Sequence, residues 1–418
     1  MEVVHLLEKY QKVRNHTVAL CKPLKTEDYI PQPIVDVSPP KWHLGHTTWF
    51  FENFILAQFQ EKYTIFKKGY NYIFNSYYES QGPRVKRHTR GDLTRPTVAD
   101  VMEYREHVDQ QMLAFLQSGK LSEEVADFIA LGLEHEQQHQ ELLITDLKYT
   151  LGLNPLFPAY RPEIKYPQEL AQDTIRQEYI TIEEGVYEVG HSGDDFCFDN
   201  EKQSHKVYLH AYQVLDRLVT NREYMEFMEA GGYKQPHLWL MEGWEWVKNE
   251  EIQAPLYWEK HYDEWKTFTL YGLQDIDSEA PVTHVSFYEA EAFARWKNKR
   301  LLTEFEWEVA CKKLSPSVSE AANFVENDAL IPLGRKKGDY QMLGDAWEWT
   351  NSAYLPYPYY KQAEGALGEY NGKFMINQMV LRGGSCVTPK NHIRATYRNF
   401  FHPDKRWQFT GIRLAESC

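Results

Sequence analysis

Residues 131–147 read LGLEHEQQHQELLITDL, inside a helical pattern that opens near Ser122 and has no proline before residue 153. His135 and His139 are four residues apart, so on an α-helix their imidazoles project from one face, one turn apart. Two imidazoles at this spacing can bind a single metal ion. The pair alone is a weak signal, because two histidines on the polar surface of a helix have the same spacing.

Two kinds of metal site fit the pair. HEQQH matches H-E-x-x-H, the helix of zinc proteases, in which Glu136 would be the general base. In one class of zinc protease the motif continues with a Gly and a His at fixed steps, but here Leu142 and Thr145 stand at those positions. Another class needs a Glu further along the chain, and Glu163 is a poor candidate for it. The second possibility is a three-histidine site, for which WHLGH at residues 42–46 offers the third ligand.

Composition narrows the class of protein. The chain has 418 residues, 43% of them hydrophobic and 25% charged, which predicts a globular protein of two domains. A net charge of -14 argues against nucleic acid as the main partner, since phosphate binding needs a basic face. No apolar run is long enough to span a membrane, and the first residues do not resemble a signal peptide. Five widely spaced cysteines without C-x-x-C predict free thiols and a cytoplasmic location.

The first part of the chain predicts a helical bundle over residues 1–155. Apolar periodicity marks four helical stretches, near residues 2–18, 41–59, 97–117 and from 122 onward. Thr97 is expected to cap the third of them, and Ser38 to cap the second, with Pro39 at its first position. Metal sites in bundles are built from side chains on facing helices. His43 and His46 share only part of a face, so one is expected to point inward and the other toward a neighbour or solvent.

The connection between the second and third helices holds NSYYESQGPRVKRHTRGDLTRP, residues 75–96. A loop this long in a compact domain is usually functional or disordered. It combines Tyr77 and Tyr78 with several arginines, among them Arg87 and Arg90. Tyrosine hydroxyls can donate protons, and guanidinium groups bind carboxylates in a bidentate fork. In an acidic protein, this local cluster favours anion binding.

The remaining chain predicts a linker at residues 156–175 and an α+β domain over residues 176–418. PVTHVSFYEAEAFARW, LLTEFEWEVA, GDAWEWT, LRGGS and GIRLA resemble the domain of formylglycine-generating enzymes, which has a C-type-lectin-like fold. Those enzymes act through two cysteines shortly after RGGS, and here Thr388 and Ile393 stand at the aligned positions. Their chemistry is therefore expected to be absent, and Cys386 is expected to be a packing residue.

The N-terminal WHLGH and H-x-x-x-H-x-E motifs resemble the DinB-like metal bundle. A bundle followed by this second domain resembles the sulfoxide synthases of ergothioneine biosynthesis, as do FDNEKQSHKV, QAPLYWE and YRNFFHPDKRWQFTGIRLA. The resemblance covers nearly the whole chain and implies an iron-dependent oxidoreductase. It implies that His46, His135 and His139 hold a non-haem Fe(II), and it leaves His43 out of the ligand set. The implied reaction joins imidazole C2 of hercynine, Nα-trimethylhistidine, to a cysteine thiol, with O2 supplying the oxygen of hercynylcysteine sulfoxide.

The same resemblance suggests substrate contacts. A trimethylammonium group donates no hydrogen bond and favours aromatic faces and amide oxygens, for which the candidates by position are Gln138, Asn399, Phe400 and Phe401. The family has a branch that uses γ-glutamylcysteine and a branch that uses free cysteine. The former is expected to have an acidic residue where Phe401 stands, and this chain carries the NSYYES loop typical of the latter, so cysteine is favoured. Arg87 and Arg90 would hold its carboxylate.

Tyr77 or Tyr78 would donate the proton in this reaction. A second tyrosine-rich run, at residues 354–360, is a rival source. Several alternatives stay open: the same chemistry with γ-glutamylcysteine, with histidine as in ovothiol synthesis, or with a selenosugar; a zinc hydrolase that uses Glu136; and a lectin-like binding module without catalysis. All the partners expected are small molecules, and the sequence predicts no particular oligomeric state.

Overall fold

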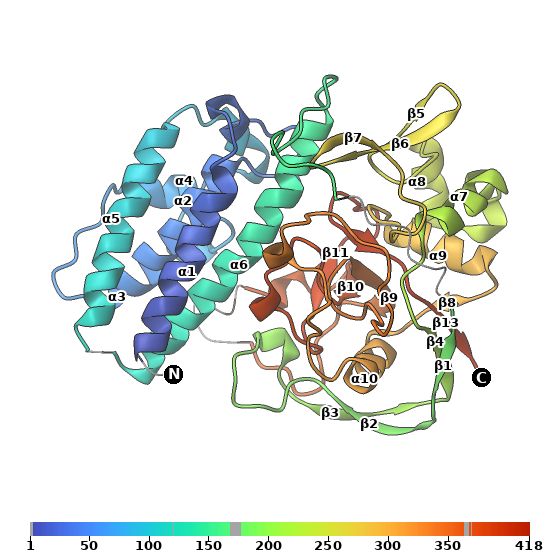
Figure 1. Cartoon of the computed structure of the whole chain (residues 1–418). Helices are drawn as coiled ribbons and strands as arrows, with labels where there is room; N and C mark the ends of the chain where they lie inside the picture. The colour runs from blue at the N-terminus through green and yellow to red at the C-terminus, as the bar shows by residue number, and fades with distance from the viewer. Residues whose placement is uncertain (1–2, 120, 168–176, 363–367, 369) are drawn as a thin grey trace. The chain divides into compact units, whose positions relative to one another are not determined.

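The computed structural model describes residues 3–119, 121–167, 177–362, 368 and 370–418, which form two compact units (Figure 1). The first unit takes in the chain up to Arg161, and the second begins at Pro162. Residues 168–175 of the expected linker lie outside the described residues. The fold is mixed α+β, helical in the first unit and strand-containing in the second, as the sequence predicts.

Within residues 3–119 and 121–161, four long helices make a bundle. They are α1 (Val3–Cys21), α2 (Pro40–Phe51), α5 (Val98–Gln117) and α6 (Glu123–Gly152). The π-helical turn η2 (Glu52–Leu56) and α3 (Ala57–Phe59) continue α2, and the short α4 (Gly69–Phe74) follows. Helix α2 packs against α5 and α6, and α1 packs against α6. The predicted four-helix bundle is confirmed.

Local capping explains where these helices begin. The Thr97 hydroxyl accepts from the Asp100 amide while the Asp100 carboxylate accepts from the Thr97 amide, a reciprocal cap that starts α5. At the start of α6, the Ser122 hydroxyl accepts from the Val125 amide. The expectation for α2 is wrong by one residue, because the helix begins at Pro40 and Pro39 is its N-cap. The amide of Ser38 donates instead to Asp146 of α6, 2.7 Å away.

Helix α2 lies at the centre of the bundle, and every residue from Pro40 to Phe51 is buried. Its polar side chains are therefore out of contact with water and need partners from neighbouring helices. Gly45 fits because α4 comes very close: a Cβ added there would lie 2.1 Å from the Phe74 ring. The side chains of His43 and His46 on this helix are therefore held in place by contacts with neighbouring residues.

The described part of the second unit contains two four-stranded sheets, in the orders β1-β4-β13-β8 and β11-β10-β9-β12. Their strands are β1 (Tyr179–Ile182), β4 (Tyr212–Leu215), β8 (Arg300–Leu301), β9 (Trp347–Ala353), β10 (Met379–Arg382), β11 (Asn399–Phe401), β12 (Thr410–Gly411) and β13 (Leu414–Ser417). Smaller sheets pair β2 (Gly185–Val189) with β3 (His205–Leu209), and join β5 (Trp258–His261), β6 (Glu264–Thr269) and β7 (Gly272–Asp275). Strand β13 pairs antiparallel with both β4 and β8, so it lies inside the first of these sheets.

Four helices accompany these described sheets: α7 (Asn221–Glu229), α8 (Met241–Asn249), α9 (Phe287–Trp296) and α10 (Glu304–Leu314). The Thr303 hydroxyl accepts from the Glu306 amide and so caps α10. Buried tryptophans fill the core, and the Trp307 indole donates to Glu348, which also forms a bidentate pair with Arg413. Aromatic side chains and paired charges thus hold an irregular fold together.

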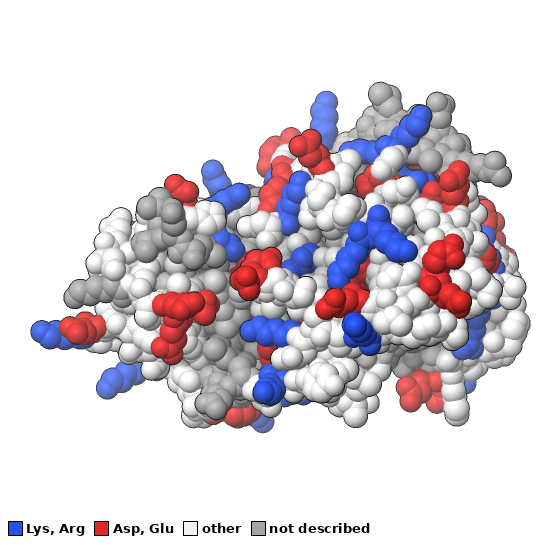
Figure 2. Space-filling view, turned by 90° about the horizontal axis from the view of Figure 1, so that it is seen from below, with Lys and Arg blue, Asp and Glu red and all other residues white. Residues whose placement is uncertain are grey.

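None of the helices in the described part of the chain combines the length and apolar character needed to cross a bilayer. On the face seen in Figure 2, the blue and red side chains of opposite charge are interspersed. The distribution on that face is a mixture of single charges and small groups, with no broad basic area among the described residues.

Candidate metal centre

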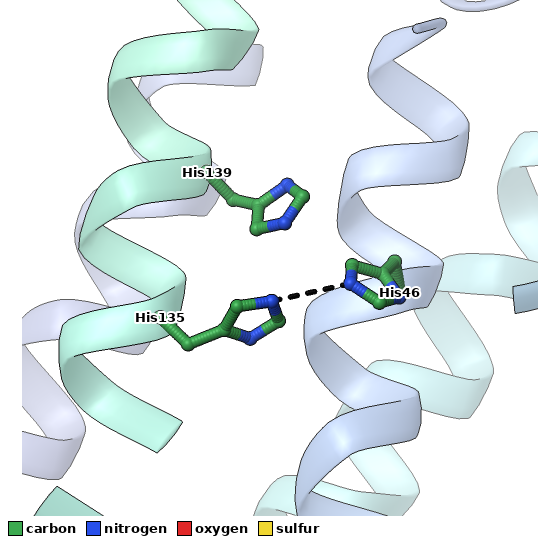
Figure 3. Close-up of side chains that lie close together, drawn as sticks. All are labelled: His46, His135 and His139. Carbon is green, nitrogen blue, oxygen red and sulfur yellow. Dashed lines mark hydrogen bonds between the residues drawn. The ribbon is translucent and has the colours of Figure 1, made fainter. Parts of the chain in front are cut away.

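Three buried histidines from two helices converge in the first unit. His46 comes from α2, and His135 and His139 come from α6 (Figure 3). One ring nitrogen of each lies within 4.8 Å of those of the other two, and the Nε2 atoms of His46 and His135 are 3.2 Å apart. Imidazole nitrogens bound to one ion at about 2.1 Å lie about 3 Å from one another, so the donor set fits a single metal ion. The structure brings the predicted trio together.

The electrostatics of the trio favour metal binding over protonation. Burial, and then repulsion by His135, hold the pKa values of His46 and His139 well below the usual range. Burial also lowers the pKa of His135, to about 3, although Glu136 opposes the shift. At neutral pH all three imidazoles are therefore uncharged and keep a nitrogen lone pair, the form that binds a metal.

The ring of His46 is fixed on several sides. Its Nδ1–H donates to the carbonyl of Phe74 at 2.6 Å, which leaves the Nε2 lone pair directed at the other two histidines. Trp42 and Trp49 both stack on the ring, with centroids 4.5 and 5.6 Å away. The close approach of α4 at Gly45 is what brings the Phe74 carbonyl within reach.

His43, which the sequence leaves out of the ligand set, lies directly behind His139. Their Nδ1 atoms are 2.8 Å apart, and His43 Nε2 is 3.1 Å from Asp146 Oδ2. All three side chains are buried. His43 therefore points toward a neighbouring side chain, which is one of the two directions expected for it. That neighbour is His139.

Glu136 points away from the trio, into the core between α1, α5 and α6. Its carboxylate accepts from Arg14 at 2.8 Å, from Thr17 at 2.6 Å and from Arg105. Burial raises its pKa, but Arg105 and Arg14 overcome that effect and lower it to about 2. A carboxylate so fully bonded cannot deprotonate a water at the histidines, which removes the role that the zinc-hydrolase interpretation gave it.

Tyr78 is buried beside this centre, and Tyr77 is half-buried. The Tyr78 ring lies 5.6 Å from that of Trp49, which stacks on His46, and Tyr77 stacks on Tyr78 at 4.7 Å. The Asn75 side chain bonds both the amide and the carbonyl of Tyr78 and so fixes the backbone there.

The two arginines named from the sequence lie in different surroundings, although both belong to η4 (Arg87–Asp92). Arg90 is buried, its guanidinium lies 3.4 Å over the Trp42 ring, and it donates to the hydroxyls of Ser38 and Ser76. Burial holds the pKa of Arg90 well below its usual range. Arg87 is exposed and donates to the carbonyls of residues 35 and 36. Among described residues, neither forms an ion pair with a carboxylate.

The other substrate candidates are divided between the units. Gln138 is half-buried on α6 beside His139. Asn399, Phe400 and Phe401 form β11, which pairs with β10. Phe400 stacks on Tyr354 with centroids 3.9 Å apart, and Phe401 packs against Trp407 at 5.4 Å.

The rival tyrosines of the second unit are engaged or exposed. The Tyr354 hydroxyl accepts from Asn200, while those of Tyr357 and Tyr360 donate to Glu304 and Asp199. Tyr359 is 81% exposed. Cys386, Thr388 and Ile393 are all buried, and the Thr388 hydroxyl accepts from the Ser385 amide.

Comparisons with known proteins match this division. Residues 9–143 match the DinB superfamily, and residues 166–418 match the sulfatase-modifying factor enzyme 1-like domain. The hercynine oxygenase of Mycolicibacterium smegmatis is 31% identical over 312 residues, 68% of this chain and 71% of its own. That of Mycobacterium tuberculosis is 32% identical over 309 residues, 68% and 70% of the two chains.

Two further matches cover a smaller share of the chain. The formylglycine-generating enzyme of Bos taurus is 26% identical over 285 residues, 56% of this chain and 74% of its own. The structure of PvdO from Pseudomonas aeruginosa covers 57% of this chain and 94% of its own, with 16% identity and a TM-score of 0.38. The identity to the hercynine oxygenases and the extent of these matches settle the family: this chain, in which a DinB-type domain precedes a sulfatase-modifying-factor-like domain, belongs to the hercynine oxygenases.

Proposed function

We propose that this protein is an Fe(II)- and O2-dependent sulfoxide synthase that joins imidazole C2 of hercynine to the sulfur of free cysteine. The reaction breaks one C–H and one S–H bond and forms one C–S and one S–O bond, while the second oxygen atom of O2 leaves as water. The observation that carries this proposal is the buried three-histidine centre in a chain of the hercynine oxygenase family. Its free thiols are in keeping with a reducing cytoplasm.

His46, His135 and His139 would hold the metal through neutral imidazoles. Three nitrogen ligands leave coordination positions open for small molecules, and imidazole and thiolate are both suitable ligands for iron. When bound, Fe(II) supplies the electron exchange with O2 that the thiol and the imidazole cannot perform alone. The chain's part is to present lone pairs in a fixed arrangement and to exclude water, which the burial of all three rings supports.

Arg90 is suited to the carboxylate of cysteine. It is a buried cation that donates to two serine hydroxyls, and a buried charge without an anionic partner is costly. A substrate carboxylate would supply that partner next to Trp42 and, through it, His46. Arg87, on the same turn, would add a second donor at the exposed side.

Tyr78 is assigned the donation of the proton. Its ring is buried between Trp49 and Phe54, in the aromatic layer that also contacts His46. Tyr77, stacked on Tyr78, is the alternative within the same loop. A phenol held in a fixed position can deliver a proton without bringing bulk water to the reacting groups.

Gln138 is assigned to the trimethylammonium group of hercynine, because it directly precedes His139 on α6 and carries an amide oxygen. Asn399, Phe400 and Phe401 offer an amide and two aromatic faces, the kinds of group that a trimethylammonium cation favours. Phe401 stands where an acidic residue would bind the amine of a γ-glutamyl group, and this favours cysteine as the thiol.

Product analysis by mass spectrometry tests the proposal. Protein reconstituted with Fe(II) is given hercynine and O2 with cysteine or with γ-glutamylcysteine, and histidine replaces hercynine in a parallel reaction. Hercynylcysteine sulfoxide should form with hercynine and cysteine, and His135→Ala should form none. Hydrolytic activity that persists without O2, or no C–S product from any pair, would overturn the assignment.

A further inference from the structure

A buried chain of polar groups runs from Asp146 through His43 to His139. Asp146 Oδ2 lies 3.1 Å from His43 Nε2, and His43 Nδ1 lies 2.8 Å from His139 Nδ1. No more than 9% of any of these side chains is exposed. These hydrogen bonds connect α2 to α6 twice, and the last side chain in the series, His139, is one of the three proposed metal ligands.

The positions of the protons along this chain follow from the chemistry of its ends. Asp146 Oδ2 also accepts from the amide of Ser38 at 2.7 Å, so this oxygen is held as an acceptor. His43 must then carry its proton on Nε2 to donate to Asp146, which leaves a lone pair on Nδ1. That lone pair accepts from Nδ1–H of His139.

These proton positions determine whether Nε2 of His139 can bind a metal ion. With its proton on Nδ1, this imidazole keeps a lone pair on Nε2, the nitrogen that Figure 3 shows turned toward the other two rings. A histidine partner is ambiguous, because it can donate or accept, whereas the carbonyl that holds His46 can only accept. If His43 took the opposite tautomer, it would donate to His139 and place the His139 proton where a metal ion must bind. Asp146 removes this ambiguity.

Ser38 fixes Asp146 in turn. Its amide donates to Asp146, and its hydroxyl accepts from Arg90 at 2.9 Å, immediately before α2 begins. The carboxylate is thus oriented by the backbone as well as by His43. We infer that Asp146 and His43 are positioning residues, which set the tautomer of His139 so that its Nε2 is available to a metal ion.

This inference rests on the metal centre of the proposed function, and it is tested by metal binding rather than by activity. Two variants of His43 separate its two nitrogens. In His43→Asn the amide oxygen takes the place of Nδ1 and can still accept from His139. In His43→Gln the amide reaches the place of Nε2, toward Asp146, and offers no acceptor at the Nδ1 position.

Cobalt(II), titrated anaerobically into the full-length protein, reports through its visible absorption both the affinity and the number of ligands. His43→Gln should weaken binding by about 10- to 100-fold, as loss of a ligand's hydrogen-bonding partner does, and His43→Asn should restore most of it. Thermal unfolding of the metal-free variants checks that both are folded. Equal affinities for the two variants, or unchanged affinity in His43→Gln, would overturn the inference.

Asp146→Asn provides the same test one hydrogen bond further away, should either His43 variant not fold. Its amide oxygen keeps the bond to Ser38 but lacks the full negative charge, so binding should weaken by about tenfold. Unchanged affinity would contradict the role of Asp146. A wild-type protein that binds no cobalt at these histidines would instead refute the metal centre itself, so the two failures are distinguishable.

Discussion

At the scale of single residues, His135 offers the simplest separation of metal binding from folding. His135→Ala should lower metal affinity by more than about 100-fold, the upper end of what losing only a ligand's partner costs. His107, a half-buried histidine of α5 that packs against Phe66, gives the matched control, and His107→Ala should bind metal normally. Metal content after dialysis measures both. Equal metal content in the two variants would exclude His135 as a ligand.

The tyrosine pair makes a prediction about products. Tyr78→Phe keeps the ring that packs against Trp49 and Phe54 and removes only the hydroxyl. Without a proton donor, the reaction should shift from sulfoxide toward simple oxygenation of the thiol. The product ratio by mass spectrometry checks this, with Tyr77→Phe as the companion variant. If neither variant changes the ratio, the proton comes from elsewhere.

Which residues the sequence could identify depends on how local their geometry is. The spacing of His135 and His139 predicts a shared helix face without knowledge of any other element. The contact of His43 with Asp146 depends on how α2 packs against α6, and no local rule gives that pairing. Likewise, an Arg in a polar loop does not reveal that Arg90 is buried over Trp42.

At the scale of helices, Gly45 controls how closely α4 approaches α2. An alanine there would place Cβ 2.1 Å from the Phe74 ring, so the ring and its backbone must move. Gly45→Ala should destabilise the bundle by about 1–3 kcal/mol and weaken metal binding, because the Phe74 carbonyl also holds His46. Gly69→Ala, on α4 with nothing within 4 Å, is the matched control and should have neither effect. Cobalt titration and thermal unfolding measure the two; normal metal binding in Gly45→Ala would contradict the argument.

Glu136 ties α6 to α1 and α5 through Arg14 and Arg105. Glu136→Gln should destabilise the bundle by about 3–5 kcal/mol, since two buried cations lose an anion. Hydrogen exchange in these helices measures it, with the exposed Glu124→Gln as a control within about 1 kcal/mol of wild type.

The low pKa of Glu136 makes its contribution to the stability of the bundle depend on pH. Its pKa is about 2 in the folded protein against an ordinary 4.5, so its contribution is complete above pH 4.5 and is lost as the pH falls toward 2. The difference between wild type and Glu136→Gln should therefore shrink over this range. A constant difference would show that the carboxylate is not stabilised as the hydrogen bonds indicate.

Helix boundaries were predictable where a side chain caps its own helix, as Thr97 and Thr303 do. At α2 the prediction fails by one residue, because the Ser38 amide and hydroxyl bind Asp146 and Arg90. A tertiary contact there replaces the local cap. The irregular sheets of the second unit follow less from periodicity than from motifs such as LRGGS and GDAWEWT, which the resemblance identified.

At the scale of the whole molecule, the chain combines a bundle that presents three imidazoles with an α+β unit that presents Asn399, Phe400 and Phe401 along one strand. The family assignment rests on both, since 31–32% identity to hercynine oxygenases extends over about 70% of the chain. We propose that the three histidines hold one Fe(II) for the oxidative coupling of hercynine and cysteine.

The most direct test exposes the Fe(II)-loaded protein, with hercynine and cysteine, to isotopically labelled O2 and follows the product by mass spectrometry. The proposal predicts hercynylcysteine sulfoxide that contains one labelled oxygen atom, formed only with iron present and not by the His135→Ala variant. Absence of any C–S product, or an oxygen atom that comes from water, would contradict it.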